Sequence, residues 1–150
     1  MPYSVLQVAK TLGQLSGWSL SNLEMQKIAF ISEMLHLGRT GTPLVQGDFE
    51  AWDRGPVHPE LYRWAKMYGS SKVQSPAFGH VAPLMPGTTE YKAVQDAYNS
   101  MREMSPWQKV DLTHQSNGAW AGCYQPGRRG IRIPKEKIKE EYGVRVTETD

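Results

Sequence analysis

Residues 49–62 read Phe-Glu-Ala-Trp-Asp-Arg-Gly-Pro-Val-His-Pro-Glu-Leu-Tyr, and this stretch determines how a strand meets a helix. Residues 49–53 have the pattern of a short strand, and Gly55-Pro56 is a tight turn that ends it. Pro59 suits the first turn of a following helix, because the N–H that proline lacks would have no partner there. No catalytic constellation is visible in this stretch, which favours a shaped binding scaffold over an enzyme.

The alternation of side chains along the strand also places a tryptophan. If Phe49 and Ala51 face the core, Trp52 faces away and needs either a covering helix or a binding partner. Tryptophan is the commonest hot-spot residue of protein interfaces, but a position in the core is the more frequent one. We therefore expect core positions for Trp52, Trp64, Trp107 and Trp120.

Apolar residues at helical spacing predict helices on both sides of this stretch. Helices are expected over 4–16, over 22–37, from Pro59 to Gly69, after Thr88, from Ser105 to about His114, and from Pro134 to Tyr142. The helix over 22–37 begins with a capping box of Ser21 and Glu24, and it is apolar nearly all round, which marks it as the central core helix. Gly38 is expected to end it.

These elements define the predicted fold class, which is mainly α (α+β). We expect a compact bundle of about six helices with a small two- or three-stranded antiparallel β element, in which residues 131–133 pair with 49–53. Residues 118–120 begin a short turn or helix, and residues 70–88 form a long loop. Residues 1–150 are expected to be a single domain, with 143–150 as a frayed tail.

The composition limits the class of protein. Hydrophobic residues make up 39% and charged residues 21% of the 150, which suits one soluble core. The formal charge of +2 is only mildly basic, so it is not by itself a nucleic-acid signature. Cys123, the single cysteine, cannot form an internal disulfide, which indicates a reducing cytoplasm. We expect no membrane span, because no apolar run approaches the required length of about 18 residues.

Catalytic and metal-binding patterns are absent from the sequence. The histidines are scattered singly, and no zinc-type or phosphate-cradling motif occurs. Asp111, His114 and Cys123 would need a shared pocket to act as a nucleophilic site, so Cys123 is better interpreted as a small apolar side chain. We therefore expect no enzyme activity, no catalytic residue, no cofactor and no metal. His58 is either a contact residue at a helix start or a turn residue packed on Trp52 or Tyr62.

A basic segment over residues 128–145 has two interpretations. Its cations could contact phosphates: Arg128, Arg129, Arg132, Lys135, Lys137, Lys139 and Arg145. Its interspersed carboxylates, from Glu136, Glu140 and Glu141, favour a solvated helix face instead. Arg128 and Arg129 could equally meet an acidic protein partner.

Several pieces of the chain together resemble a known family. The pattern Trp52-x-x-Gly-Pro-Val-x-Pro-x-Leu-Tyr62 resembles the central signature of the SocA-like antitoxins, also called Panacea-domain proteins, with relatives labelled phage-associated GepA-like proteins. Three further pieces agree in order: Met25-Gln-Lys-Ile28, Thr113-His114 followed by Trp120, and the segment from Ile133 to Tyr142. The resemblance covers about residues 5–142.

The resemblance implies a mostly helical domain with a small sheet that acts as a bacterial, prophage or phage antitoxin. It would bind and neutralise a cognate toxin, and one relative is an adaptor that delivers its toxin to a AAA+ protease. The expected partner-binding residues are Trp52, Arg54, Gly55, Pro56, His58, Tyr62, Arg63 and Trp120, with Gly55 and Pro56 acting through backbone geometry. The alternatives are a nucleic-acid-binding regulator and a phage-encoded inhibitor or adaptor of a host protein.

Overall fold

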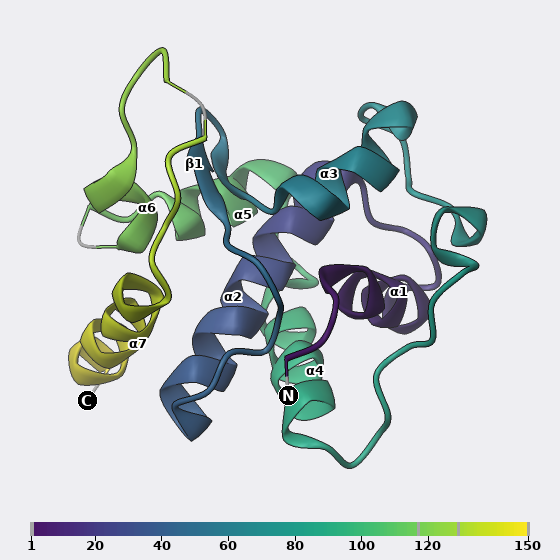
Figure 1. Ribbon diagram of the computed structural model, residues 1–150, viewed down its shortest axis with the longest axis horizontal. Helices are drawn as coiled ribbons and strands as arrows, with labels where there is room; N and C mark the ends of the chain where they lie inside the picture. Colours follow the sequence, from purple (N-terminus) through teal and green to yellow (C-terminus); the bar gives the residue numbers. More distant parts are fainter. Residues whose placement is uncertain (1, 117, 129, 150) are drawn as a thin grey trace.

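The computed structural model describes residues 2–116, 118–128 and 130–149, with side chains as far as Arg145. Figure 1 shows a mainly helical molecule with one small sheet, which confirms the predicted fold class. The helices are α1 (Val5–Ser16), α2 (Asn22–Thr40), α3 (Pro59–Ala65), α4 (Thr89–Met101), α5 (Pro106–Thr113), α6 (Ala119–Cys123) and α7 (Lys135–Thr149), with short 3-10 helices at Lys66–Tyr68 and Ser75–Phe78. The strands are β1 (Glu50–Trp52) and β2 (Gly55–Val57).

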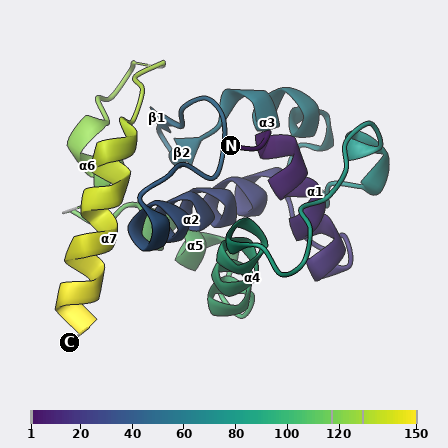
Figure 2. The same cartoon turned by 60° about the horizontal axis from the view of Figure 1, so that its bottom comes forward.

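Helix α2 is the centre of the molecule, as its apolar surface predicts. Its sides pack against α1, α4, α5 and α7, and Figure 2 shows it running between α7 and α1. The predicted capping box forms at its start, where the Glu24 backbone N–H donates to Ser21 Oγ over 3.3 Å. Buried residues occupy nearly every position from Met25 to Met34, so the helix supplies core contacts in all directions.

The predicted end of this helix at Gly38 is wrong. Helix α2 continues to Thr40 and is ended by Gly41, whose φ of 79° is left-handed. Gly38 instead lies against α7, where a Cβ would come within 2.1 Å of the Tyr142 ring. Its missing side chain therefore permits close helix packing, a reason for glycine that the sequence cannot separate from a cap.

The predicted turn at Gly55-Pro56 is also corrected, because these residues begin a second strand and the turn lies at Asp53 and Arg54. Strands β1 and β2 pair antiparallel, with Glu50 opposite Val57 and Trp52 opposite Gly55. Proline is tolerated because β2 is an edge strand. The predicted third strand is reduced to a single bridge between Glu50 and Arg132.

The tryptophans divide between core and surface. Trp120 is buried and Trp52 is half-buried under α3, whereas Trp64 is 40% and Trp107 is 66% exposed. The expected core positions of the last two are therefore wrong. Leu61 and Ala65 take the inward face of α3, which leaves Trp64 outside, stacked near the ring of His80.

Helix α7 does not stop at the predicted Tyr142 but continues through Gly143 to Thr149. Fraying of residues 143–150 in solution stays a prediction. The loop over 70–88 is anchored on α1, because Thr11 Oγ1 accepts a hydrogen bond from the Leu84 backbone over 2.9 Å. Among the described residues, no helix has the length and apolar character needed to cross a membrane.

Candidate partner-binding site

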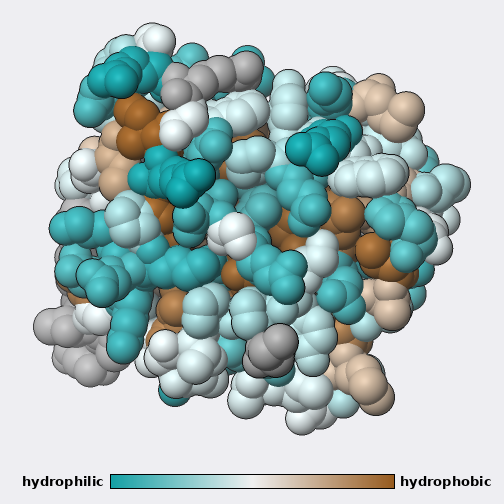
Figure 3. All heavy atoms as spheres, viewed as in Figure 1, coloured by the Kyte–Doolittle hydropathy of each residue, from teal (hydrophilic) through white to brown (hydrophobic). Residues whose placement is uncertain are grey.

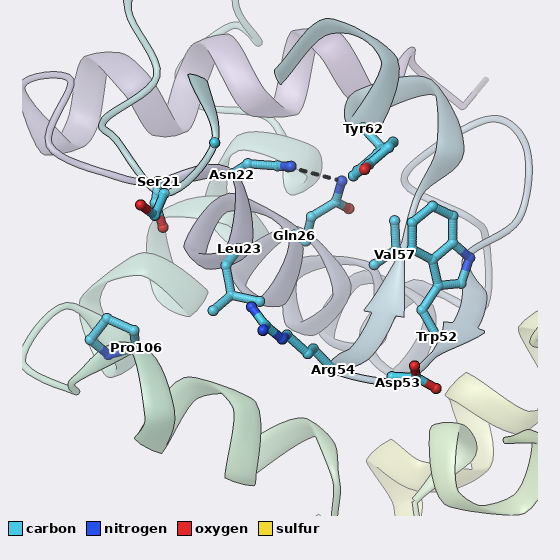
Figure 4. Close-up of a pocket in the computed structure, with 12 residues that line it drawn as sticks. Ser21, Asn22, Leu23, Gln26, Trp52, Asp53, Arg54, Val57, Tyr62 and Pro106 are labelled. Atoms are coloured by element: carbon cyan, nitrogen blue, oxygen red, sulfur yellow. Dashed lines mark hydrogen bonds between the residues drawn. The ribbon is translucent and has the colours of Figure 1, made fainter. Parts of the chain in front are cut away.

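A groove of about 470 Å³ lies where the start of α2, the β1–β2 hairpin and α3 meet. Figure 4 shows its lining side chains gathered from these three elements, with Pro106 of α5 at one end. Three of the predicted partner-binding residues line it, namely Trp52, Arg54 and Tyr62. The remaining lining residues are Ser21, Asn22, Leu23, Gln26, Asp53, Val57, Gly69, Ser70 and Pro106.

Two aromatic rings form one wall of the groove. Trp52 and Tyr62 meet edge to face, with ring centroids 4.9 Å apart and planes at 64°. The indole N–H of Trp52 donates to Glu50 Oε1 over 2.9 Å, so the orientation of the ring is fixed. Such pairs add to the free energy gained by burying their surface, which makes this wall stiff as well as apolar.

Arg54 brings a charge to the groove. It lies exposed in the hairpin turn, and Figure 4 shows its side chain extended toward Leu23 of α2. Among the ion pairs of the described residues, none involves Arg54. The carboxylate of its neighbour Asp53 accepts a hydrogen bond from the Tyr124 hydroxyl over 2.5 Å. The guanidinium therefore has no carboxylate partner of its own.

A lysine is buried beneath the hairpin. Lys27 of α2 is fully buried, and its ammonium donates to the Pro56 carbonyl over 3.1 Å. Burial lowers the pKa of Lys27 to about 7, with a smaller contribution from the positive charge of Arg54. The sequence does not predict that Lys27 is buried, because lysine is almost always exposed.

Gly55 lies next to this lysine, at a position that has no room for a side chain. Its φ is 109°, and a Cβ there would lie 2.9 Å from Thr113 Oγ1, 3.0 Å from Lys27 Nζ and 3.1 Å from His114 Nε2. Two observations thus support the predicted role of Gly55 in fixing backbone geometry, namely its left-handed backbone conformation and the lack of space for a Cβ. Pro56 is buried beside it and offers its carbonyl to Lys27.

Trp120 supports the hairpin from α6. Its indole N–H donates to the Trp52 carbonyl over 2.7 Å, and its ring stacks on His114 with centroids 3.7 Å apart. Burial lowers the pKa of His114, and the charge of Lys27 contributes in the same direction. Trp120 does not line the groove, so it supports the hairpin from the side away from the groove lining.

His58 and Arg63 lie outside the groove. The expected ring contacts of His58 are corrected: it is buried, and its ring meets Phe49 edge to face at 5.2 Å rather than Trp52 or Tyr62. Its Nε2 contacts the Gln46 carbonyl at 2.9 Å, and burial lowers its pKa. A direct partner contact by His58 is therefore closed off in this conformation. Arg63 is exposed on α3 without lining the groove.

Sequence reasoning missed the contribution of α2 to the site. Leu23 lies in the predicted core helix, yet it is half-buried and lines the groove. Gln26 links α2 to the end of the hairpin, because its Oε1 accepts a hydrogen bond from the His58 backbone N–H over 2.8 Å. The available signal was the position of Leu23 in the first turn of α2, two residues after the capping residue Ser21.

The geometry gives little support to cysteine chemistry, phosphate binding or metal binding. Cys123 is half-buried, and burial raises the pKa of its thiol. In the basic segment, Lys135 pairs with the buried Glu33 at 2.8 Å, Arg145 pairs with Glu141, and Arg129 lies outside the described residues. Two of its cations are thus committed to internal carboxylates. Within the described part of the chain, no three metal-binding side chains of the His, Cys, Asp and Glu types gather.

Comparison with known proteins gives the family. The model of the family described as antitoxin SocA-like, Panacea domain, matches residues 25–121, which include the hairpin and most of the groove. Antitoxin SocA of Caulobacter vibrioides (strain NA1000 / CB15N) is 31% identical over 135 residues, which cover 82% of this chain and 72% of that protein. No solved structure shows a significant match. The chain belongs to the SocA-like, Panacea-domain antitoxin family.

Proposed function

We propose that this protein is an antitoxin that neutralises a cognate toxin by direct, stoichiometric binding through the groove. The observation that carries the proposal is the convergence of Trp52, Tyr62 and an unpaired Arg54 on one groove in a member of an antitoxin family. Aromatic residues and arginine are the side chains most often found at the energetic centre of protein interfaces.

The support beneath the hairpin favours tight binding. Trp120 and Lys27 hold the backbone of β1 and β2 through their hydrogen bonds to Trp52 and Pro56. A surface that is already fixed loses little conformational entropy when a partner binds. The groove is therefore suited to recognition by shape, with little rearrangement of its backbone.

The same residues give little support to catalysis, and we propose a non-enzymatic mechanism. Among the side chains that line the groove, none is a histidine or a cysteine. The Ser21 hydroxyl is engaged with the Glu24 backbone as the cap of α2. The same hydroxyl donates to Glu24 Oε1 over 3.3 Å, and the Glu24 carboxylate is paired with Lys109 at 2.7 Å. The hydroxyl and the carboxylate that could activate it are thus both engaged in capping and pairing α2. Occlusion of a toxin's active site requires none of these groups.

A co-expression experiment tests this proposal. The open reading frames that flank the gene would each be expressed alone and then together with this protein. We expect one of them to arrest growth alone, to be tolerated in the pair, and to co-purify with this protein. The absence of any toxic neighbour, or rescue without co-purification, would contradict direct neutralisation.

Two arginines provide a matched pair of variants for the same assay. Arg54 lines the groove, whereas Arg63 is also exposed but lies outside it. Arg54→Glu should abolish rescue and co-purification, and Arg63→Glu should preserve both. The opposite pattern would move the interface to the outer face of α3. Delivery of the toxin to a protease remains a separate proposal, tested by asking whether the toxin's half-life falls when this protein is present.

A further inference from the structure

We infer that the groove accepts an acidic–apolar segment of the toxin, in which a carboxylate meets Arg54 and a large apolar side chain packs on the Trp52–Tyr62 wall. The inference rests on the proposed function, and it specifies the chemistry of the partner at the same site. It follows from the charges near the hairpin turn, from the composition of the groove and from the spacing of its features.

Arg54 at the hairpin turn has no ion-pair partner among the described residues. Arg54 takes part in none of the ion pairs of the described residues, and the same holds for Lys27 beneath it. By contrast, nearby Lys109 is bound to Glu24 at 2.7 Å. The neighbouring Asp53 carboxylate accepts from the Tyr124 hydroxyl, and no carboxylate of the described residues forms an ion pair with the Arg54 guanidinium. A partner carboxylate could pair with the guanidinium in a two-pronged hydrogen-bonded arrangement.

The groove combines an apolar wall with polar lining residues (Ser21, Asn22, Gln26, Asp53 and Ser70), and its size suits a peptide segment. Trp52 and Tyr62 form one wall, Val57 lies beside this wall, Leu23 lies across the groove on α2, and Pro106 closes the far end (Figure 4). A volume of about 470 Å³ falls in the range of about 300–1,000 Å³ typical of ligand sites. It suits one large side chain with part of its backbone, and a single polar anchor would set the orientation.

The spacing of the two features restricts the partner sequence. Trp52 and Arg54 are separated by one residue in the turn of a tight hairpin. Side chains that meet them are therefore expected close together in the partner, at most two or three positions apart in an extended segment. Nucleic acid fits less well, since phosphate recognition draws on several cations and this groove offers Arg54 alone at its surface.

Occupation of the turn by a carboxylate has a measurable consequence for Lys27. The Arg54 charge is one of the causes that lower the pKa of Lys27 to about 7. A bound carboxylate offsets that charge and raises the pKa of Lys27 in the complex. Binding then takes up protons near neutrality, so the affinity is greatest below about pH 7 and falls as the pH rises through the higher pKa of the bound state.

Selection from a phage-displayed library of short random peptides against the full chain tests the inference. We expect the selected peptides to carry Asp or Glu within two or three positions of Phe, Trp, Leu or Met. The same library selected against Arg54→Glu should yield Lys or Arg in place of the acid, and Arg63→Glu should yield the wild-type pattern. Thermal unfolding of each variant would verify that it is folded.

A quantitative arm uses a synthetic peptide with the selected sequence. We expect its affinity for Arg54→Gln to be weaker by about tenfold or more, and its affinity for wild type to fall above about pH 7. Peptides without an acidic residue, or the same acidic pattern selected by Arg54→Glu, would overturn the inference. If the co-expression rescue holds while the peptide result fails, the antitoxin function stands and the groove chemistry is wrong. If rescue fails while the acidic pattern appears, the groove chemistry stands and the antitoxin function is wrong.

Discussion

One set of residues supports the hairpin and another lines the groove beside it. The two sets differ in how far their side chains are buried and bonded within the protein. The hairpin support consists of Lys27, Gly55, Thr113, His114 and Trp120. Its side chains are wholly or largely buried, and Lys27 and Trp120 are bonded to the hairpin backbone. In the groove, Arg54 is exposed and unpaired, and Trp52 and Tyr62 are half-buried.

This difference separates shape from partner choice. Every member of the hairpin support belongs to a motif by which the chain resembles its family, whereas Asp53 and Arg54 fall at the open positions of the signature Trp-x-x-Gly-Pro-Val. Trp52 and Tyr62 of the groove also belong to this signature, and Arg54 adds a charge at one of its open positions. Substitutions in the support should act mainly on stability, and substitutions in the groove mainly on binding.

Gly55→Val is expected to have the largest effect. The substitution forces a branched side chain into a left-handed backbone and against Thr113 and Lys27, at a combined cost of roughly 2–5 kcal/mol in the free energy of unfolding. Gly87→Val is the matched control, because φ there is 90° and nothing lies within 4 Å of a Cβ. Chemical denaturation should show only the backbone cost for the control. Equal losses in both variants would mean that the crowding beneath Gly55 is unimportant.

Lys27 makes stability depend on pH. Because its folded pKa of about 7 lies below the ordinary lysine value of 10.5, folding releases a proton between these limits, and the free energy of unfolding rises with pH across that window. The contribution is fully present above the upper limit and is lost as the pH falls to about 7. Lys27→Met should remove this slope from denaturation curves measured at several pH values.

Arg54→Gln sharpens the same measurement. Removing the guanidinium removes one cause of the lowered pKa of Lys27, so the pH window over which stability rises should narrow at its lower end without disappearing. A variant that keeps the wild-type window would show that burial alone sets the pKa. A Lys27→Met variant that keeps it would show that the lysine is charged in the folded protein.

Trp120→Phe should have an intermediate effect. It removes the indole N–H that bonds the Trp52 carbonyl, which costs about 1–3 kcal/mol if that carbonyl stays buried without a donor. Trp64→Phe serves as the control at a 40% exposed tryptophan, with a change within about 0.5 kcal/mol. Thermal or chemical unfolding of the two variants side by side gives the comparison, and equal stability would exclude a supporting role for Trp120.

Arg54→Ala should have the smallest effect on folding and a large one on binding. Its side chain is exposed and unpaired, so the free energy of unfolding should change by no more than about 0.5 kcal/mol. Co-purification with the toxin should nevertheless be lost or strongly reduced. Retained binding together with a large loss of stability would reverse the assignment of Arg54 from the groove to the support.

Local signals predicted most of the fold. Capping boxes at Ser21 and Ser105, together with Pro106 and Thr88, located the starts of three helices, because caps act through neighbours in the sequence. Gly38 and Gly55 were harder, because each faces a partner distant in the chain. A glycine that permits close packing looks the same in the sequence as one that ends a helix or a strand.

The site was predictable only in part, for the same reason. Trp52, Arg54 and Tyr62 lie within one short stretch, so a local pattern could bring them together. Leu23 and Pro106 come from α2 and α5, and only the packing of those helices brings them to the groove. The burial of His58 also depends on distant contacts with Phe49 and Gln46.

Amide hydrogen exchange on this protein, alone and in complex with the toxin found by co-expression, tests the central claim most directly. The groove is the proposed interface, so added protection is expected at residues 52–54, at residues 21–26 and along α3. Exchange at α7 should be unchanged. Added protection confined to α7 or to the 70–88 loop, with none at the hairpin, would contradict binding through the groove.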